Sequence, residues 1–136
     1  MGNLMSTIKA NDLQTTTGGI PTVKGQRLIP TAWVNWNQES NTVVDSENIS
    51  SVTDRGEGLG TLNFATAMDN NNYTVVGNWL DGGGENDSRV FNHSTGTTAS
   101  TTQFNFFGGY PDPSTGHGIS LNDASMVSII VLGGQA

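Results

Sequence analysis

The fold is constrained most by a series of short segments in which apolar and polar residues alternate. In residues 32–37, Ala32, Val34 and Trp36 point to one side of an extended strand, and Trp33 points to the other. No window carries a sustained apolar repeat at helical spacing. Similar segments recur at intervals of about ten residues, separated by Gly-, Asn- and Asp-rich turns, at 43–52, 60–66, 73–80, 89–91, 102–106 and 126–132. This pattern predicts an all-β chain folded as an antiparallel, jelly-roll-like β-sandwich.

The apolar residues are distributed unevenly along the chain, which predicts two parts. A chain of 136 residues is long enough for one compact core. Residues 1–19 are polar, with Ile8 and Leu13 as their only well-spaced apolar residues, and we expect residues 1–30 to form an extended N-terminal arm, with residues 31–136 forming the β-sandwich domain. Ile8, Leu13 and Ile20 are the apolar residues with which such an arm would dock on a partner.

Two segments are apolar on both faces, which suggests contact with another subunit. In the segment 73–80, Tyr73, Val75 and Trp79 share one face while Val76 and Leu80 share the other, as expected of a central, covered strand. We predict subunit contacts through Trp33, Trp36, Tyr73 and Trp79. An ordinary sandwich strand with one partly exposed tryptophan explains the pattern around Trp33 equally well.

The charge of the chain argues against several classes of partner. The net charge is −7, and the five basic residues are scattered along the sequence. We therefore expect neither nucleic acid nor an anionic membrane surface as a partner. The absence of cysteine excludes disulfides and thiolate metal sites.

Catalytic and metal-binding signals are weak, so we predict a protein that is not an enzyme and needs no cofactor. The only histidines are His93 and His117, and no nucleophile elbow, phosphate-binding loop or dinucleotide fingerprint is present. Three carboxylates in the loop 81–88 resemble an oxygen-rich calcium site, but they lack the EF-hand spacing. His117 could form a nitrogen-ligand site only if several copies met at a symmetry axis. The weak metal candidates are thus Asp81, Glu85, Asp87 and His117.

Polar loops provide the candidate binding residues. Tyr110 lies in the longest predicted loop, 108–125, together with His117, and Asn92 begins another polar loop. Aromatic faces and amide groups suit sugars or polar protein surfaces, so we predict surface binding by Tyr110, His117 and Asn92. Ordinary loop chemistry explains the same residues equally well.

Four segments occur in a recognisable order: Ala32–Asn37, Asn48–Asp54, Gly60–Met68 and Asn72–Gly77. Together they resemble the C-terminal domain of small bacteriophage tail-fibre and virion structural proteins. The resemblance implies a β-rich and often trimeric protein, with an N-terminal segment that docks on the particle and a C-terminal domain that faces the host. The chain departs from these proteins because it has no long shaft between arm and domain.

These observations lead to the expectation of a non-enzymatic structural protein on the virion surface, assembled as a homotrimer. The leading role is a short tail fibre for host attachment, with other virion proteins and a host-surface polysaccharide or protein as partners. The alternative is a capsid decoration or cement protein that stabilises the head shell. A free carbohydrate-binding lectin is a third interpretation, which leaves the arm unexplained.

Overall fold

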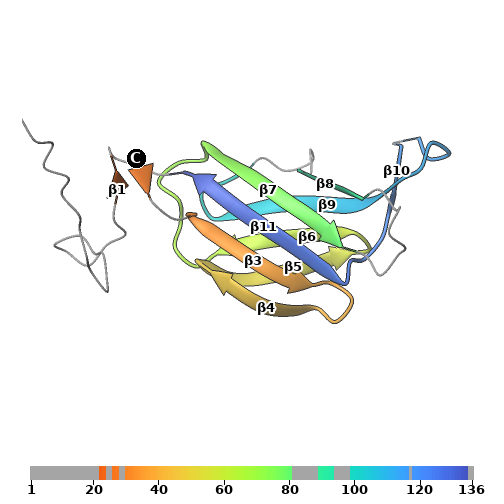
Figure 1. Cartoon of the computed structure of the whole chain (residues 1–136), viewed down its shortest axis with the longest axis horizontal. Helices are drawn as coiled ribbons and strands as arrows, with labels where there is room; N and C mark the ends of the chain where they lie inside the picture. The colour runs from red at the N-terminus through yellow and green to blue at the C-terminus, as the bar shows by residue number, and fades with distance from the viewer. Residues whose placement is uncertain are drawn as a thin grey trace, which may run out of the picture.

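The structure, a computed structural model, describes residues 22–23, 26–27, 30–80, 89–93, 99–116 and 118–134. These residues form strands and turns, and they include no helix long and apolar enough to cross a membrane. Two antiparallel sheets pack face to face, which confirms the predicted all-β sandwich (Figure 1). A separate two-stranded hairpin pairs β1 (Thr22–Val23) with β2 (Gln26–Arg27).

The first sheet has four strands and contains both the first and the last strand of the sandwich. Its order is β4 (Thr42–Glu47), β3 (Ala32–Asn37), β11 (Met126–Gly133) and β7 (Tyr73–Leu80). Residues that alternate along β3 are buried, as are Val127, Ile129 and Val131 on β11. Both β3 and β11 therefore direct one set of side chains into the core, as the alternation predicts, whereas β4 is exposed along most of its length.

The second sheet has five strands. Its order is β10 (Ile119–Leu121), β9 (Gln103–Pro111), β6 (Leu59–Phe64) and β5 (Ile49–Gly56), and β8 (Val90–His93) also pairs with β9. The hairpin between β5 and β6 closes through the glycine-rich turn at residues 56–58. Leu62 and Phe64 point inward, and Met68 is buried at the end of the sandwich.

Aromatic side chains fill the space between the sheets. Trp36 meets Phe106 edge to face, with ring centroids 6.0 Å apart. Aromatic rings lie directly over Gly60, Gly77 and Gly108, and the last two show how close the approach is. A Cβ atom at Gly108 would fall 2.3 Å from the Trp79 ring, and one at Gly77 would fall 2.4 Å from the Phe91 ring. Glycine is therefore needed at both positions for the rings to pack.

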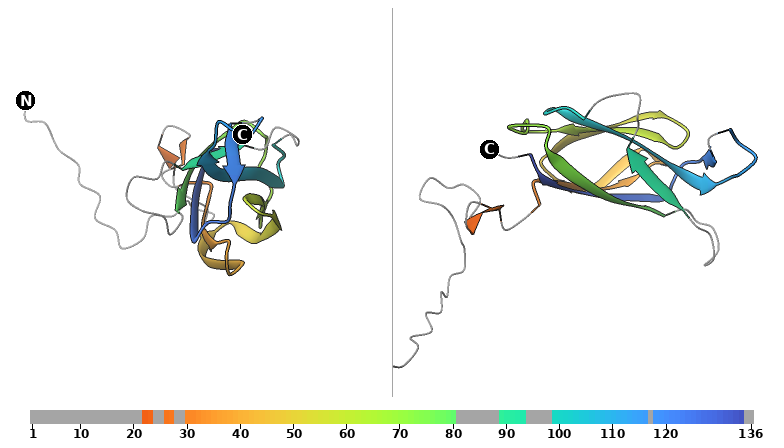
Figure 2. Two further views of the ribbon diagram at one scale, coloured as in Figure 1. Left: turned by 90° about the vertical axis from the view of Figure 1, so that its right-hand side faces the viewer. Right: turned by 90° about the horizontal axis from the view of Figure 1, so that it is seen from above.

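Two sequence-based predictions about strand placement are wrong. The segment 73–80 is not a central strand, because β7 lies at one edge of its sheet and, of the strands that the structure describes, pairs only with β11. The predicted loop 108–125 contains the end of β9 and the strand β10, which pair in antiparallel register around Tyr110 and Ser120. Figure 2 shows this extension at the end of the sandwich opposite the C-terminus.

Candidate functional site

An exposed apolar row crosses the outer face of the four-stranded sheet. Ile130 on β11 pairs with Val76 on β7 and with Trp33 on β3, so these three side chains lie side by side on one face. Val76 is 57% exposed and Ile130 is 43% exposed, while Trp33 is half-buried. We refer to Val76, Ile130 and Trp33 as the apolar row.

The surroundings of the apolar row divide this face into an apolar and an acidic region. Leu80 and Leu132 are exposed on the β7 and β11 side. On the opposite side, Glu47 of β4 pairs with Trp33, and Asp45 pairs with Asn35. The face is therefore apolar towards β7 and negatively charged along β4. Grouped exposed apolar side chains of this kind mark contact surfaces in soluble proteins.

Only one of the four predicted subunit-contact residues lies on this face. Trp36 and Trp79 are 1% and 3% exposed and belong to the core of the chain itself, so the prediction that they contact another subunit is wrong. The faces of β3 and β7 that carry these two tryptophans pack against the second sheet instead. Tyr73 also points inward, where its hydroxyl donates to Ser100 O at 3.0 Å. Trp33 remains the candidate contact.

A cleft of about 300 Å³ opens between β7 and β8, on the edge of the sandwich. Its lining is mainly aromatic and comprises Tyr73, Val75, Phe91, Asn92, His93, Ala99 and Phe104. The His93 ring stacks on Phe104 with centroids 5.0 Å apart and planes at 13°. Burial raises the pKa of the Tyr73 hydroxyl, although the hydrogen bond to Ser100 opposes the shift. The cleft thus offers flat rings and a few polar atoms, a combination that suits a small, uncharged ligand.

The structure separates two of the residues predicted to bind a surface. Asn92 lines the aromatic cleft, whereas Tyr110 lies further along β9 with the Arg89 guanidinium 5.9 Å above its ring. Asn92 pairs with Phe107, three positions from Tyr110 along the strand. The sequence-based prediction included Asn92 but missed Phe91 and His93. Their spacing of two along a strand was the signal that both face inward.

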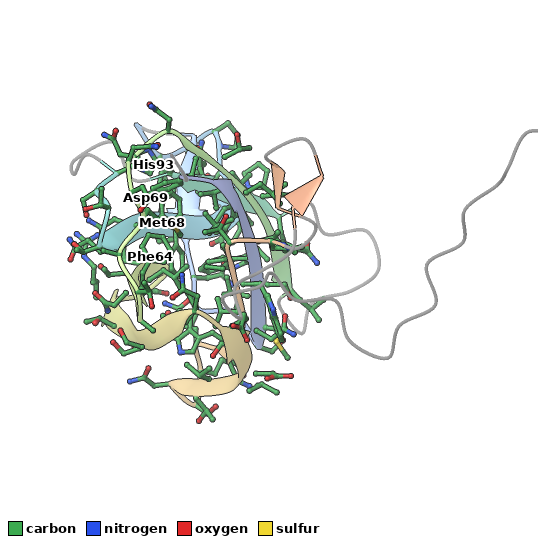
Figure 3. The ribbon with its side chains drawn as sticks, turned by 90° about the vertical axis from the view of Figure 1, so that its left-hand side faces the viewer. Phe64, Met68, Asp69 and His93 are labelled. Carbon is green, nitrogen blue, oxygen red and sulfur yellow. The ribbon has the colours of Figure 1, made fainter. Side chains whose placement is uncertain are left out.

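A second hollow, of about 440 Å³, lies where the described chain enters and leaves the sandwich. Pro30, Asn48 and Gly134 line it, and the Asn48 side chain connects two of the segments that form its wall. The Asn48 side chain accepts a hydrogen bond from Thr66 N at 2.8 Å and donates to Thr31 O at 3.2 Å. Figure 3 looks onto this end of the sandwich, where Met68 and Asp69 line the hollow.

Several predicted site residues lie outside the described part of the chain. These are the metal candidates Asp81, Glu85, Asp87 and His117, and the docking candidates Ile8, Leu13 and Ile20. Across the described ranges, no three His, Cys, Asp or Glu side chains gather in a way that could hold a metal ion. Searches of protein-family models, curated proteins and solved structures find no match to the chain.

Proposed function

We propose that the chain is a non-enzymatic structural protein of a virion, displayed on the particle surface and held there by contacts with copies of itself and with other virion proteins. The observation that carries this proposal is the apolar row on the outer face of the four-stranded sheet. Val76 and Ile130 are exposed beside Trp33, and covering them with a second protein surface would remove apolar area from water.

The leading role is a short tail fibre that attaches the particle to its host. The order of four segments similar to phage tail-fibre proteins supports this role, and the same resemblance supports a homotrimer. Three copies would present three aromatic clefts and three sets of loops around Tyr110 to a host-surface polysaccharide or protein. Weak contacts made at three linked sites raise the overall affinity well above that of one site.

A capsid decoration protein is the second candidate, and the direct connection between the predicted arm and the sandwich favours it. The first strand of the sandwich begins at Ala32, directly after the predicted arm of residues 1–30. A fibre normally has a shaft between these parts, whereas a protein that lies flat on a shell needs none. In this role the arm would cross neighbouring capsid subunits and stabilise the shell.

The position and copy number of the chain in purified particles test the proposal and separate its two roles. Imaging and quantitative mass spectrometry should find a few copies on the tail for a fibre, or many copies on the head for a decoration protein. Absence of the chain from particles would contradict both roles.

Substitutions on β3 test the part played by the apolar row. Trp33→Ser removes the largest member of the row, and Asn35→Ser changes the next residue on the same face. We expect the first variant to fold but to be lost from particles, and the second to be retained. Equal retention of both variants would show that the row does not mediate attachment.

A further inference from the structure

Among the described strands, β7 leaves one long and uncharged edge without a pairing partner. It is the last strand of the four-stranded sheet, and it is seen along the upper side of the sheet in Figure 1 and from above in Figure 2. Its eight residues, Tyr73–Leu80, include no charged residue and no proline. Edge strands of this kind present a row of backbone donors and acceptors to which another strand can pair.

The alternation of hydrogen-bonded pairs between β7 and β11 identifies which backbone groups of β7 point outward. Gly134 N donates to Asn72 O at 3.1 Å, so even-numbered residues of β7 form the hydrogen-bonded pairs with β11. The N–H and C=O groups of Tyr73, Val75, Gly77 and Trp79 therefore point away from β11. Among the described residues, these backbone groups make no hydrogen bond to another segment.

The other two long edges of the sandwich are protected against such pairing. β4 carries Asp45 and Glu47 and has an irregular register with β3 between Asn35 and Trp36. β5 carries Asp54 and Arg55, and its register with β6 shifts twice. Charges and bulges are the usual devices that prevent edge-to-edge association, and β7 lacks the charges.

We propose that β7 pairs with β7 of a second copy of this chain, antiparallel about a two-fold axis, joining the two four-stranded sheets into one sheet of eight strands. One register pairs all four outward-facing residues with one another, placing Tyr73 opposite Trp79 and Val75 opposite Gly77 of the second copy. In this register Val76 faces its own counterpart across the axis, as a pair without direct backbone hydrogen bonds.

Charge and surface chemistry favour a second copy as the occupant of the edge. A neutral strand pairs with itself without like-charge repulsion, although the chain carries a net charge of −7. The acidic residues of the sheet lie on β4, three strands and about 14 Å from the β7 edge, which exceeds the screening length of about 8 Å at physiological salt. Pairing would also join the apolar rows of the two copies into one continuous row through Val76.

This pairing goes beyond the proposed function and does not compete with it. The second copy adds in the plane of the sheet, so the outer face that carries Trp33 and Ile130 stays free for contacts with other virion proteins. In a trimer that uses the outer face, the β7 edges would join two trimers.

Single cysteine substitutions in the full chain provide the test, because the chain has no cysteine of its own. Val76→Cys places two thiols opposite each other with Cα atoms about 4.5 Å apart, within the range of a disulfide. We expect mild oxidation to yield a covalent dimer that reducing agent dissociates. Asn78→Cys is the matched control on the same face of β7, since its own counterpart would lie about 13 Å away.

A mixture of two variants tests the register itself. Thr74 faces Asn78 of the second copy, so Thr74→Cys mixed with Asn78→Cys should give a mixed dimer, while each variant alone should give almost none. Equal cross-linking of Val76→Cys and Asn78→Cys would indicate random collision and overturn the proposal.

The mass in solution separates this proposal from the proposed function. A monomer of 14.3 kDa that forms no cross-link would refute the β7 pairing while leaving incorporation into particles to be judged by the Trp33 variants. An oligomer in which Val76→Cys stays reduced would show that the copies meet at another surface. If removal of residues 1–29 then abolished this oligomer, the arm would be the segment that joins the copies, and the proposed pairing of β7 with β7 would be wrong.

Discussion

Replacing Gly108 with alanine tests how closely the two sheets approach each other. The added methyl group would lie 2.3 Å from the Trp79 ring, whereas ordinary contact begins at 3.4 Å. The ring or the strand must therefore move by about 1.1 Å, the difference between these distances. Trp79 is buried on all sides and β9 is held between β6 and β8, so neither yields easily. We expect a loss of about 3 kcal/mol, the upper end of the usual cost of overpacking.

Urea unfolding followed by tryptophan fluorescence measures this loss. With a slope of about 2 kcal/mol per molar urea, the midpoint should fall by roughly 1.5 M. Gly116→Ala is the matched control, since a Cβ at Gly116 meets nothing within 4 Å and should change the free energy of unfolding by less than about 0.5 kcal/mol. If Gly108→Ala unfolded at the same urea concentration as Gly116→Ala, the close approach of ring and strand would not limit this fold.

Three further predictions concern stability and are checked by the same unfolding measurement. Leu62→Ala should cost about 3 kcal/mol because its site is fully buried, whereas Leu132→Ala, at a site 47% exposed, should cost less than about 0.5 kcal/mol; similar costs would mean that the core is misassigned. Asn48 has a φ of 55° and three side-chain hydrogen bonds, so Asn48→Ala should cost about 3 kcal/mol and Asn48→Gly about 1 kcal/mol less. The raised pKa of Tyr73 keeps its hydroxyl protonated in the folded state after it ionises in the unfolded chain, so stability should fall as pH rises above 10.0. Tyr73→Phe should weaken that fall and cost about 1 kcal/mol at neutral pH; an unchanged alkaline fall would assign it to other groups.

The buried faces of the strands were predictable from the sequence because a sandwich strand has one side in the core. The alternation around Trp36 and Ile129 therefore identifies which side chains are buried. The order of strands across a sheet depends on pairing between distant segments, and no local pattern records it. β7 has apolar residues on both faces, so Val76 suggested a covered central strand although it lies on the open face of an edge strand.

The candidate site was less predictable than the fold for the same reason. Asn92 was found from loop composition, but the cleft that it borders is assembled by β7, β8 and β9 together. Tyr110 and Asn92 seemed equivalent as polar-loop residues, and only the register of β8 on β9 separates them. The strand β10 was missed because Ile119–Leu121 is short and is ordered by its pairing with β9.

The central place of β11 has a consequence for synthesis of the chain on the ribosome. The Thr31 hydroxyl donates to Gly133 O at 2.8 Å across 102 positions of the sequence, so β3 can pair early with β4 but finds its second neighbour only after β11 has been made. At about 5–20 residues per second, Trp36 waits roughly 5–18 s for Val127, its partner on β11. The β5–β6 hairpin can close during that interval, but the four-stranded sheet cannot. The nascent chain therefore exposes the apolar face of β3 to water for seconds before the sandwich can close over it.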